Sequence, residues 1–171
     1  ENYPFLPTAR ALLRHCLNIN LPVFASCFGF QLAVQELGGV VTQEPEHFEI
    51  GVLPIQILAA AEEDLLFQRG SHSMLAVSVH RQSAQVCPPA CIELARTDVC
   101  CHAFRVEGKP FWAFQFHPEL EMELVHQRLL LYKDSYTEGE EHFRMVIETL
   151  QETPEATQLL GAFVERVLLA G

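Results

Sequence analysis

The segment around Cys27 has the residue types of a nucleophile held at a sharp turn. Apolar residues 22–26 predict a short buried strand, and residues 28–37 predict a helix that starts directly after the cysteine. Ala25 and Gly29 are small enough to let neighbouring backbone pass close by. A thiol at a helix N-terminus is favoured as the thiolate, because the dipole and the free amides stabilise negative charge. The alternative is a small buried cysteine at the end of a strand.

A second segment supplies the groups that such a thiol would need. The apolar stretch before His117 predicts a strand that ends at the imidazole, and Pro118 prevents the sheet from continuing. Glu119 lies two residues on, where it can turn back and orient the ring. A cysteine nucleophile, a histidine base and an orienting carboxylate together suffice for acyl transfer. A histidine at a strand end is, taken alone, more often structural.

Together the two segments resemble the class I glutamine amidotransferases. That family has a strand–Cys–helix turn framed by small residues, a glutamine four residues after the cysteine, and a later His-Pro-Glu. Cys27, Gln31, His117 and Glu119 match this pattern, and the 90 residues from Cys27 to His117 are a normal separation. The resemblance extends to two further segments, Glu49-Ile50-Gly51 and the stretch from His80 to Ser83.

The resemblance implies glutamine hydrolysis that supplies ammonia to a separate synthetase, with no cofactor. Cys27 would attack the side-chain amide, His117 would protonate the leaving ammonia and activate water, and Glu119 would hold His117. The Phe28 amide is the natural oxyanion donor. The resemblance assigns substrate binding to Gln31, near the thioester. It also assigns the backbone of Gln82 and Ser83 to the amino acid end of glutamine.

The implied fold is α/β: a three-layer, flavodoxin-like arrangement of the class I amidotransferases. Helices are expected over residues 8–17, 28–37 and 154–169, the last begun by the capping hydroxyl of Thr153. Strands are expected at six further places besides residues 22–26, and residues 133–140 are expected to form a loop. The expected strands are residues 40–42, 50–58, 75–80, 92–96, 101–106 and 110–116, with a hairpin turn at Glu107-Gly108.

Two features depart from the family pattern. Ala25 stands where the family usually has glycine, which adds one methyl group. The chain also begins with a helix rather than a strand, so we expect an N-terminally incomplete fold that lacks one oxyanion donor. Losing such a donor costs roughly 100- to 1,000-fold in turnover. Residues 1–171 are expected to form one domain, with a helical extension from about residue 120 packed on the sheet.

Composition restricts the partners of the chain. The net charge is −11, from 22 acidic and 11 basic side chains, and would repel nucleic acid and anionic membranes. No apolar run approaches the roughly 20 residues that span a bilayer, and the first residues do not resemble a signal peptide. We therefore expect a cytoplasmic protein with no nucleic-acid or membrane partner.

The six cysteines are expected to be reduced thiols, most of them in the core. Cys87 and Cys91, followed by Cys100, Cys101 and His102, have a spacing unlike paired Cys-x-x-Cys zinc ligands. No metal site is therefore predicted.

Three alternatives to the amidotransferase hypothesis remain. The first is hydrolysis of a γ-glutamyl amide other than glutamine, although relatives with that activity commonly lack the carboxylate that Glu119 provides. The second is a catalytically silent regulatory member, which the atypical start favours and the intact Cys27, His117 and Glu119 disfavour. The third is a redox-sensing thiol protein, which leaves the His-Pro-Glu segment unexplained.

Overall fold

A computed structural model describes residues 3–67 and 70–170 and contains one mixed sheet of six strands. The strands follow the order β1-β6-β5-β4-β2-β3, and β1 is parallel to β6 while the other neighbours are antiparallel. The strands are β1 (Val23–Ser26), β2 (Glu49–Ile57), β3 (Ser73–His80), β4 (Cys91–Arg96), β5 (Cys101–Val106) and β6 (Phe111–Phe114).

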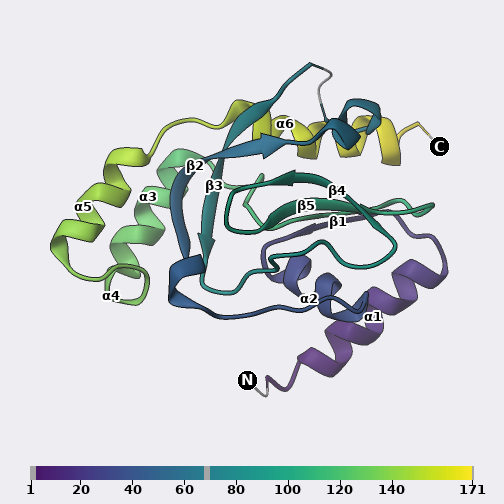
Figure 1. The fold of residues 1–171 in the computed structure, drawn as a ribbon, viewed down its shortest axis with the longest axis horizontal. Helices are drawn as coiled ribbons and strands as arrows, with labels where there is room; N and C mark the ends of the chain where they lie inside the picture. Colours follow the sequence, from purple (N-terminus) through teal and green to yellow (C-terminus); the bar gives the residue numbers. More distant parts are fainter. Residues whose placement is uncertain (1–2, 68–69, 171) are drawn as a thin grey trace.

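Helices cover both faces of the sheet, which gives three layers (Figure 1). Helices α1 (Leu6–Asn18) and α2 (Phe28–Glu36) lie on one face and contribute to a core that includes Phe30 and Phe104. Helix α6 (Pro154–Phe163) lies on the other face, and its Phe163 packs edge-on against the ring of Trp112. The predicted α/β class is confirmed, with a sheet that is mixed rather than parallel throughout.

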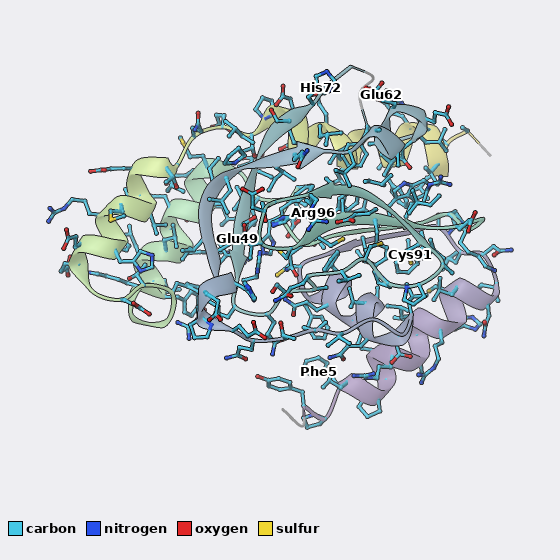
Figure 2. All side chains as sticks on the ribbon, in the orientation of Figure 1. Phe5, Glu49, Glu62, His72, Cys91 and Arg96 are labelled. Atoms are coloured by element: carbon cyan, nitrogen blue, oxygen red, sulfur yellow. The ribbon has the colours of Figure 1, made fainter. Side chains whose placement is uncertain are left out.

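Three helices lie beside β2 and β3, at the left of Figure 1: α3 (Met122–Leu131), α4 (Lys133–Tyr136) and α5 (Glu140–Thr149). A third core joins α3 and α5 to this part of the sheet. Its buried members are Val52, Val77, Leu120, Val125, Leu129 and Val146. Figure 2 shows the side chains that the sheet and the surrounding helices carry. None of the described helices is long and apolar enough to cross a bilayer.

Three local expectations were wrong. Residues 40–42 form no strand, because only Thr42 bridges to Ser83 and the preceding glycines break the pattern. Residues 133–140 contain the short helix α4, and Thr137, just after it, donates both its N–H and its hydroxyl to the carbonyl of Lys133, the first residue of the helix. Thr153 precedes α6 without capping it, because its buried side chain makes no bond to the helix amides.

β1 also differs from the expected strand buried on both faces. Among the described residues it pairs with β6 along one edge, and Ala25 is its one buried residue. The helix predicted over residues 154–169 is confirmed, because α6 continues past Phe163 as a π-helical turn from Val164 to Leu168.

Gly51 in β2 allows the end of α5 to approach the sheet closely. Its φ is +115°, and a Cβ there would lie 2.5 Å from Thr149 Oγ1. That hydroxyl accepts the Val52 N–H at 3.1 Å and donates to the Val146 carbonyl at 2.7 Å. Gly51 therefore permits both the positive φ of the backbone and the close contact between α5 and β2.

We predict that Gly51→Ala lowers the free energy of unfolding by about 1–3 kcal/mol, because the methyl group meets both a strained φ and the Thr149 hydroxyl. Urea unfolding followed by circular dichroism measures the change. The control is Gly161→Ala in α6, where no atom lies within 4 Å of an added Cβ. It should raise stability by about 0.5–1 kcal/mol. Equal effects of the two substitutions would contradict the packing argument.

Candidate active site

Cys27 lies at the sharp turn between β1 and α2, in a backbone conformation that few residues adopt. Its φ is 43° and its ψ is −94°, while its N–H is fixed by a 2.8 Å hydrogen bond to the Phe114 carbonyl. The turn is also crowded, because a Cβ on Gly29 would lie 3.1 Å from the Cβ of Ala25. The family's usual glycine is thus replaced by an alanine that the turn accommodates. A strained and half-buried cysteine at a helix start is typical of a nucleophile.

His117 comes three residues after β6, next to the thiol that follows the neighbouring strand β1. Its N–H donates to the Val77 carbonyl at 2.8 Å, which anchors the backbone to β3. Its Nδ1 lies 2.7 Å from Glu119 Oε1, and its side chain also hydrogen-bonds with Cys27. Glu119 in turn interacts with the Ser26 side chain. The thiol, imidazole and carboxylate therefore form one connected series.

These contacts change the proton affinity of the imidazole. Burial lowers the pKa of His117, but the hydrogen bonds with Cys27 and Glu119 outweigh burial and raise the pKa to about 9. Burial also raises the pKa of Glu119, and the hydrogen bond with His117 outweighs it, so this pKa lies below its ordinary value. At neutral pH the series accordingly holds an imidazolium next to the thiol and a carboxylate behind the imidazolium.

The residues assigned to substrate and oxyanion binding lie around the same turn. Phe28 is the first residue of α2, and its side chain is 45% exposed. The side-chain amide of Gln31 donates to the Gln82 carbonyl at 2.9 Å. Ser83 is fully buried, and its N–H and carbonyl both pair with Thr42. The two predicted substrate segments are therefore in contact, although the backbone of Ser83 is already bonded.

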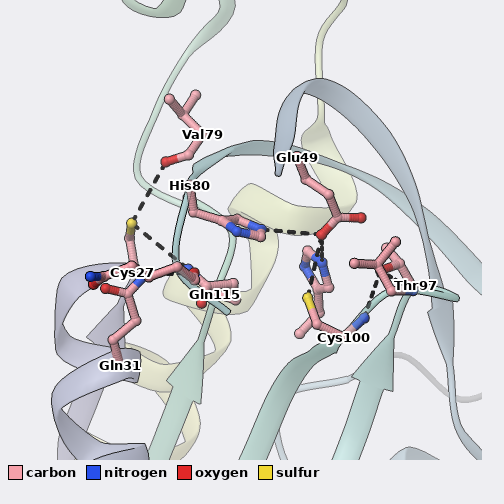
Figure 3. A network of polar contacts seen from close by, with 11 residues as sticks. Cys27, Gln31, Glu49, Val79, His80, Thr97, Cys100 and Gln115 are labelled. Carbon is pink, nitrogen blue, oxygen red and sulfur yellow. Dashed lines mark hydrogen bonds and ion pairs between the residues drawn. The ribbon is translucent and has the colours of Figure 1, made fainter. Parts of the chain in front are cut away.

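Sequence reasoning assigned no role to Gln115. Its buried side-chain amide approaches Cys27 Sγ at 3.9 Å (Figure 3), and its Oε1 has no hydrogen-bond partner within the part of the chain that the structure describes. The Val79 carbonyl lies 3.9 Å from the same sulfur atom. A polar side chain in the otherwise apolar stretch before His117 was the available signal.

A second polar cluster lies beside this site and contains a similar set of residue types. Figure 3 shows Glu49 beside His80 and Cys100, and His102 is the fourth member of this cluster. Burial raises the pKa of Glu49, but the hydrogen bond with His102 and the nearby His80 imidazole outweigh burial and hold the pKa well below its usual range. Burial and the nearby Glu49 raise the pKa of the Cys100 thiol.

A cavity of about 400 Å³ lies at the opposite end of β6 from Cys27. Among its lining residues are Arg105, Lys109, Trp112 and Arg166, next to the turn between β5 and β6. None of the predicted site residues lines it. The proposed chemistry therefore lies away from this cavity, at the carboxyl ends of β1 and β6.

The family model described as glutamine amidotransferase class-I matches residues 3–133. The chain belongs to this family. Solved amidotransferases share the fold: one from Thermotoga maritima has a TM-score of 0.81 at 21% identity and covers 96% of this chain and 70% of its own. Another from Methylobacillus flagellatus has a TM-score of 0.75 at 24% identity and covers 96% and 71%.

Curated relatives of this amidotransferase chain are glutamine-hydrolysing GMP synthases. The enzyme of Prochlorococcus marinus is 36% identical over 108 residues, which are 63% of this chain and 20% of that protein. The enzyme of Shewanella sediminis is 27% identical over 159 residues, which are 90% and 28%. The chain thus spans between a fifth and a third of the length of these relatives.

We predict that Glu119→Gln lowers the pKa of His117 from about 9 toward the ordinary 6.5, because it removes one of the two interactions that raise it. A pH titration of the imidazole carbon and nitrogen resonances by NMR measures this pKa. Because the pKa of His117 is raised in the folded state, the contribution of the protonated imidazole to folding stability is complete below pH 6.5 and is lost as pH rises through 9. The mutant should therefore lose less stability over that interval.

The control is Glu44→Gln, which removes the partner of a different histidine, His47, with Nδ1 and the carboxylate 3.0 Å apart. It should leave the His117 titration unchanged. A His117 pKa that is the same in Glu119→Gln as in the parent chain would refute the predicted coupling.

Proposed function

We propose that this chain hydrolyses the side-chain amide of glutamine and supplies ammonia to a synthetase that residues 3–170 do not contain. The observation that carries the proposal is the series of Cys27, His117 and Glu119, with the thiol at a strained turn and the carboxylate 2.7 Å from the imidazole. These three groups have the types and order that covalent acyl transfer needs.

In the first half of the reaction, the sulfur of Cys27 attacks as the thiolate, with its proton on His117, and forms a bond to the amide carbon of glutamine. The C–N bond then breaks, and the leaving nitrogen takes a proton from His117 and departs as ammonia. The Phe28 N–H, at the first position of α2, is the proposed donor to the oxyanion. Glu119 keeps the imidazolium in place while it carries charge.

The second half removes the γ-glutamyl group from Cys27. His117, now neutral, takes a proton from water, whose oxygen attacks the thioester. The C–S bond breaks, and glutamate leaves. Gln31 and Gln82, which hydrogen-bond to each other beside the turn, are the proposed contacts to the substrate, together with the neighbouring Ser83.

We assign the nucleophile to Cys27 rather than to Cys100, although Glu49, Cys100 and His102 have the same residue types. Cys100 is fully buried, so glutamine cannot reach its sulfur without opening the core. Burial and Glu49 also raise its pKa, which disfavours the thiolate. Cys27 is half-buried and lies at a helix start, where an attacked carbonyl can be accommodated.

The ammonia acceptor is proposed from the relatives. They are GMP synthases whose names state glutamine hydrolysis, and this chain matches a portion of each. A glutaminase of this kind needs no cofactor of its own. The synthetase that uses the ammonia would bind near the carboxyl ends of β1 and β6, where the amide nitrogen is released.

We predict that 6-diazo-5-oxo-norleucine, a glutamine analogue with an electrophilic carbon, alkylates Cys27 before the other five cysteines. Peptide mass spectrometry locates the adduct, and added glutamine should slow its formation. Cys27→Ala should abolish labelling and reduce glutamine hydrolysis by a factor on the order of 10⁶, as for nucleophile removal in other triad hydrolases.

The matched control is Cys91→Ala, because Cys91 is also half-buried but its thiol pKa is raised to about 12 by burial and by Cys87. This variant should label and hydrolyse as the parent chain does. Labelling of Cys100 in place of Cys27 would reverse the assignment of the nucleophile. A folded chain that shows neither labelling nor glutaminase activity would identify a silent member of the family.

A further inference from the structure

Four side chains that can bind metals converge in the core behind Cys27. Glu49 begins β2, His80 ends β3, Cys100 precedes β5, and His102 lies in β5. One ligand atom from each lies within 4.8 Å of all the others, and all four residues are buried. Glu49 Oε2 is at the centre, 2.7 Å from His102 Nε2, 3.1 Å from His80 Nε2 and 3.4 Å from Cys100 Sγ (Figure 3).

The sheet topology explains why distant residues meet here. Glu49 and His80 are directly opposite each other in the antiparallel pairing of β2 with β3. β2 pairs with β4 only at its other end, through Gln56 and Ile57. The beginning of β2 is therefore free to curl over the sheet, and it places Glu49 above His102 on β5.

The distances between the four atoms approach those of a tetrahedral metal site. Zinc bonds of about 2.0–2.1 Å to nitrogen or oxygen and about 2.3 Å to sulfur put neighbouring ligand atoms about 3.3–3.7 Å apart. The 3.1 and 3.4 Å separations lie close to that range, and the 2.7 Å separation is shorter by about half an ångström. Small side-chain movements would thus suffice to admit an ion.

Hydrogen bonding leaves part of the cluster unsatisfied. Both nitrogen atoms of His80 and Nδ1 of His102 are buried without a hydrogen-bond partner among the described residues. His80 Nε2 lies within ion-pair distance of Glu49 Oε2 but does not form a hydrogen bond with it. A cation bound between His80 Nε2 and the other ligand atoms would satisfy this nitrogen.

Charge balance leads to the same conclusion. Within the part of the chain that the structure describes, the ion pairs of Glu49 are with His80 and His102, not with lysine or arginine. A buried carboxylate that lacks such a partner is costly. A divalent ion with one carboxylate, one thiolate and two neutral imidazoles gives a site with zero net charge, which suits a buried position.

We propose that Glu49, His80, Cys100 and His102 bind one Zn²⁺ ion. The mixed nitrogen and sulfur ligands suit zinc and disfavour magnesium or calcium, which prefer oxygen. Four protein ligands close the coordination shell, so the ion is structural and takes no part in glutamine hydrolysis. This zinc proposal differs from the sequence-based prediction, which was that no metal is bound. The proposed ligands include Cys100 and His102 from the group of residues considered in the sequence, but not Cys87 or Cys91.

The ion would hold in place the parts of β3 and β5 that lie next to Cys27. Val79, whose carbonyl faces Cys27 Sγ, precedes His80, and the His102 carbonyl accepts the Gln115 N–H at 2.8 Å. The unpartnered Nδ1 atoms indicate a moderate affinity, since loss of an outer hydrogen bond weakens metal binding about 10- to 100-fold.

The test is metal binding by the untagged chain, first freed of metal by a chelator. Titration with Co²⁺ should saturate at one equivalent and give intense four-coordinate d–d bands and a thiolate-to-cobalt charge-transfer band. Zn²⁺ should displace cobalt and raise the unfolding temperature. Cys100→Ser should remove the charge-transfer band, and His102→Gln should weaken binding by at least tenfold.

The matched control is Cys91→Ser, a cysteine outside the cluster, which should keep the full cobalt spectrum. The parent chain alone can decide the question if the cluster variants do not fold. Absence of a one-equivalent cobalt spectrum in the folded parent would overturn the proposal. So would a charge-transfer band that persists in folded Cys100→Ser. Both readouts are independent of glutaminase activity, so failure of one proposal leaves the other standing.

Discussion

Ser26 lies opposite Phe114 in the parallel pairing of β1 with β6, and the rest of the candidate site depends on this register. Parallel strands bring their carboxyl ends to the same edge of a sheet, so the residue after β1 and the residues after β6 emerge side by side. Cys27 follows Ser26 directly, and its N–H bonds to the Phe114 carbonyl. A shift of one residue in either strand would turn its side chains to the other face and separate the thiol from the imidazole.

The antiparallel remainder of the sheet supports this edge. β5 and β6 form a hairpin whose core residues are almost all buried, and the His117 N–H bonds across to Val77 in β3. The backbone at His117 is therefore held in two ways, by its connection to β6 and by its hydrogen bond to β3. The helices on both faces cover the sheet, and of these helices α2 contributes the proposed site residues Phe28 and Gln31.

Residue type and spacing led to the proposed set of Cys27, His117 and Glu119, because each lies at or just after a strand end that local patterns define. The same patterns predicted the hairpin at Glu107-Gly108, where the structure has Gly108 at a φ of 68°. They could not predict the cluster around Glu49. Its members come from β2, β3 and the start of β5, and they meet because β2 curls, which depends on long-range pairing. The errors at residues 40–42 and 133–140 concern short segments, in which few residues carry the pattern.

The contact between Ala25 and position 29 has an evolutionary consequence. With a methyl group at position 25, a side chain at position 29 has 3.1 Å of room and requires a shift of a few tenths of an ångström. The two positions therefore share one small volume, and each limits what the other can accept. A lineage that carries alanine at the first position accepts a side chain at the second only if the turn makes this shift. The order in which substitutions occur at this turn is thus restricted by epistasis, and the pair should vary together across related sequences.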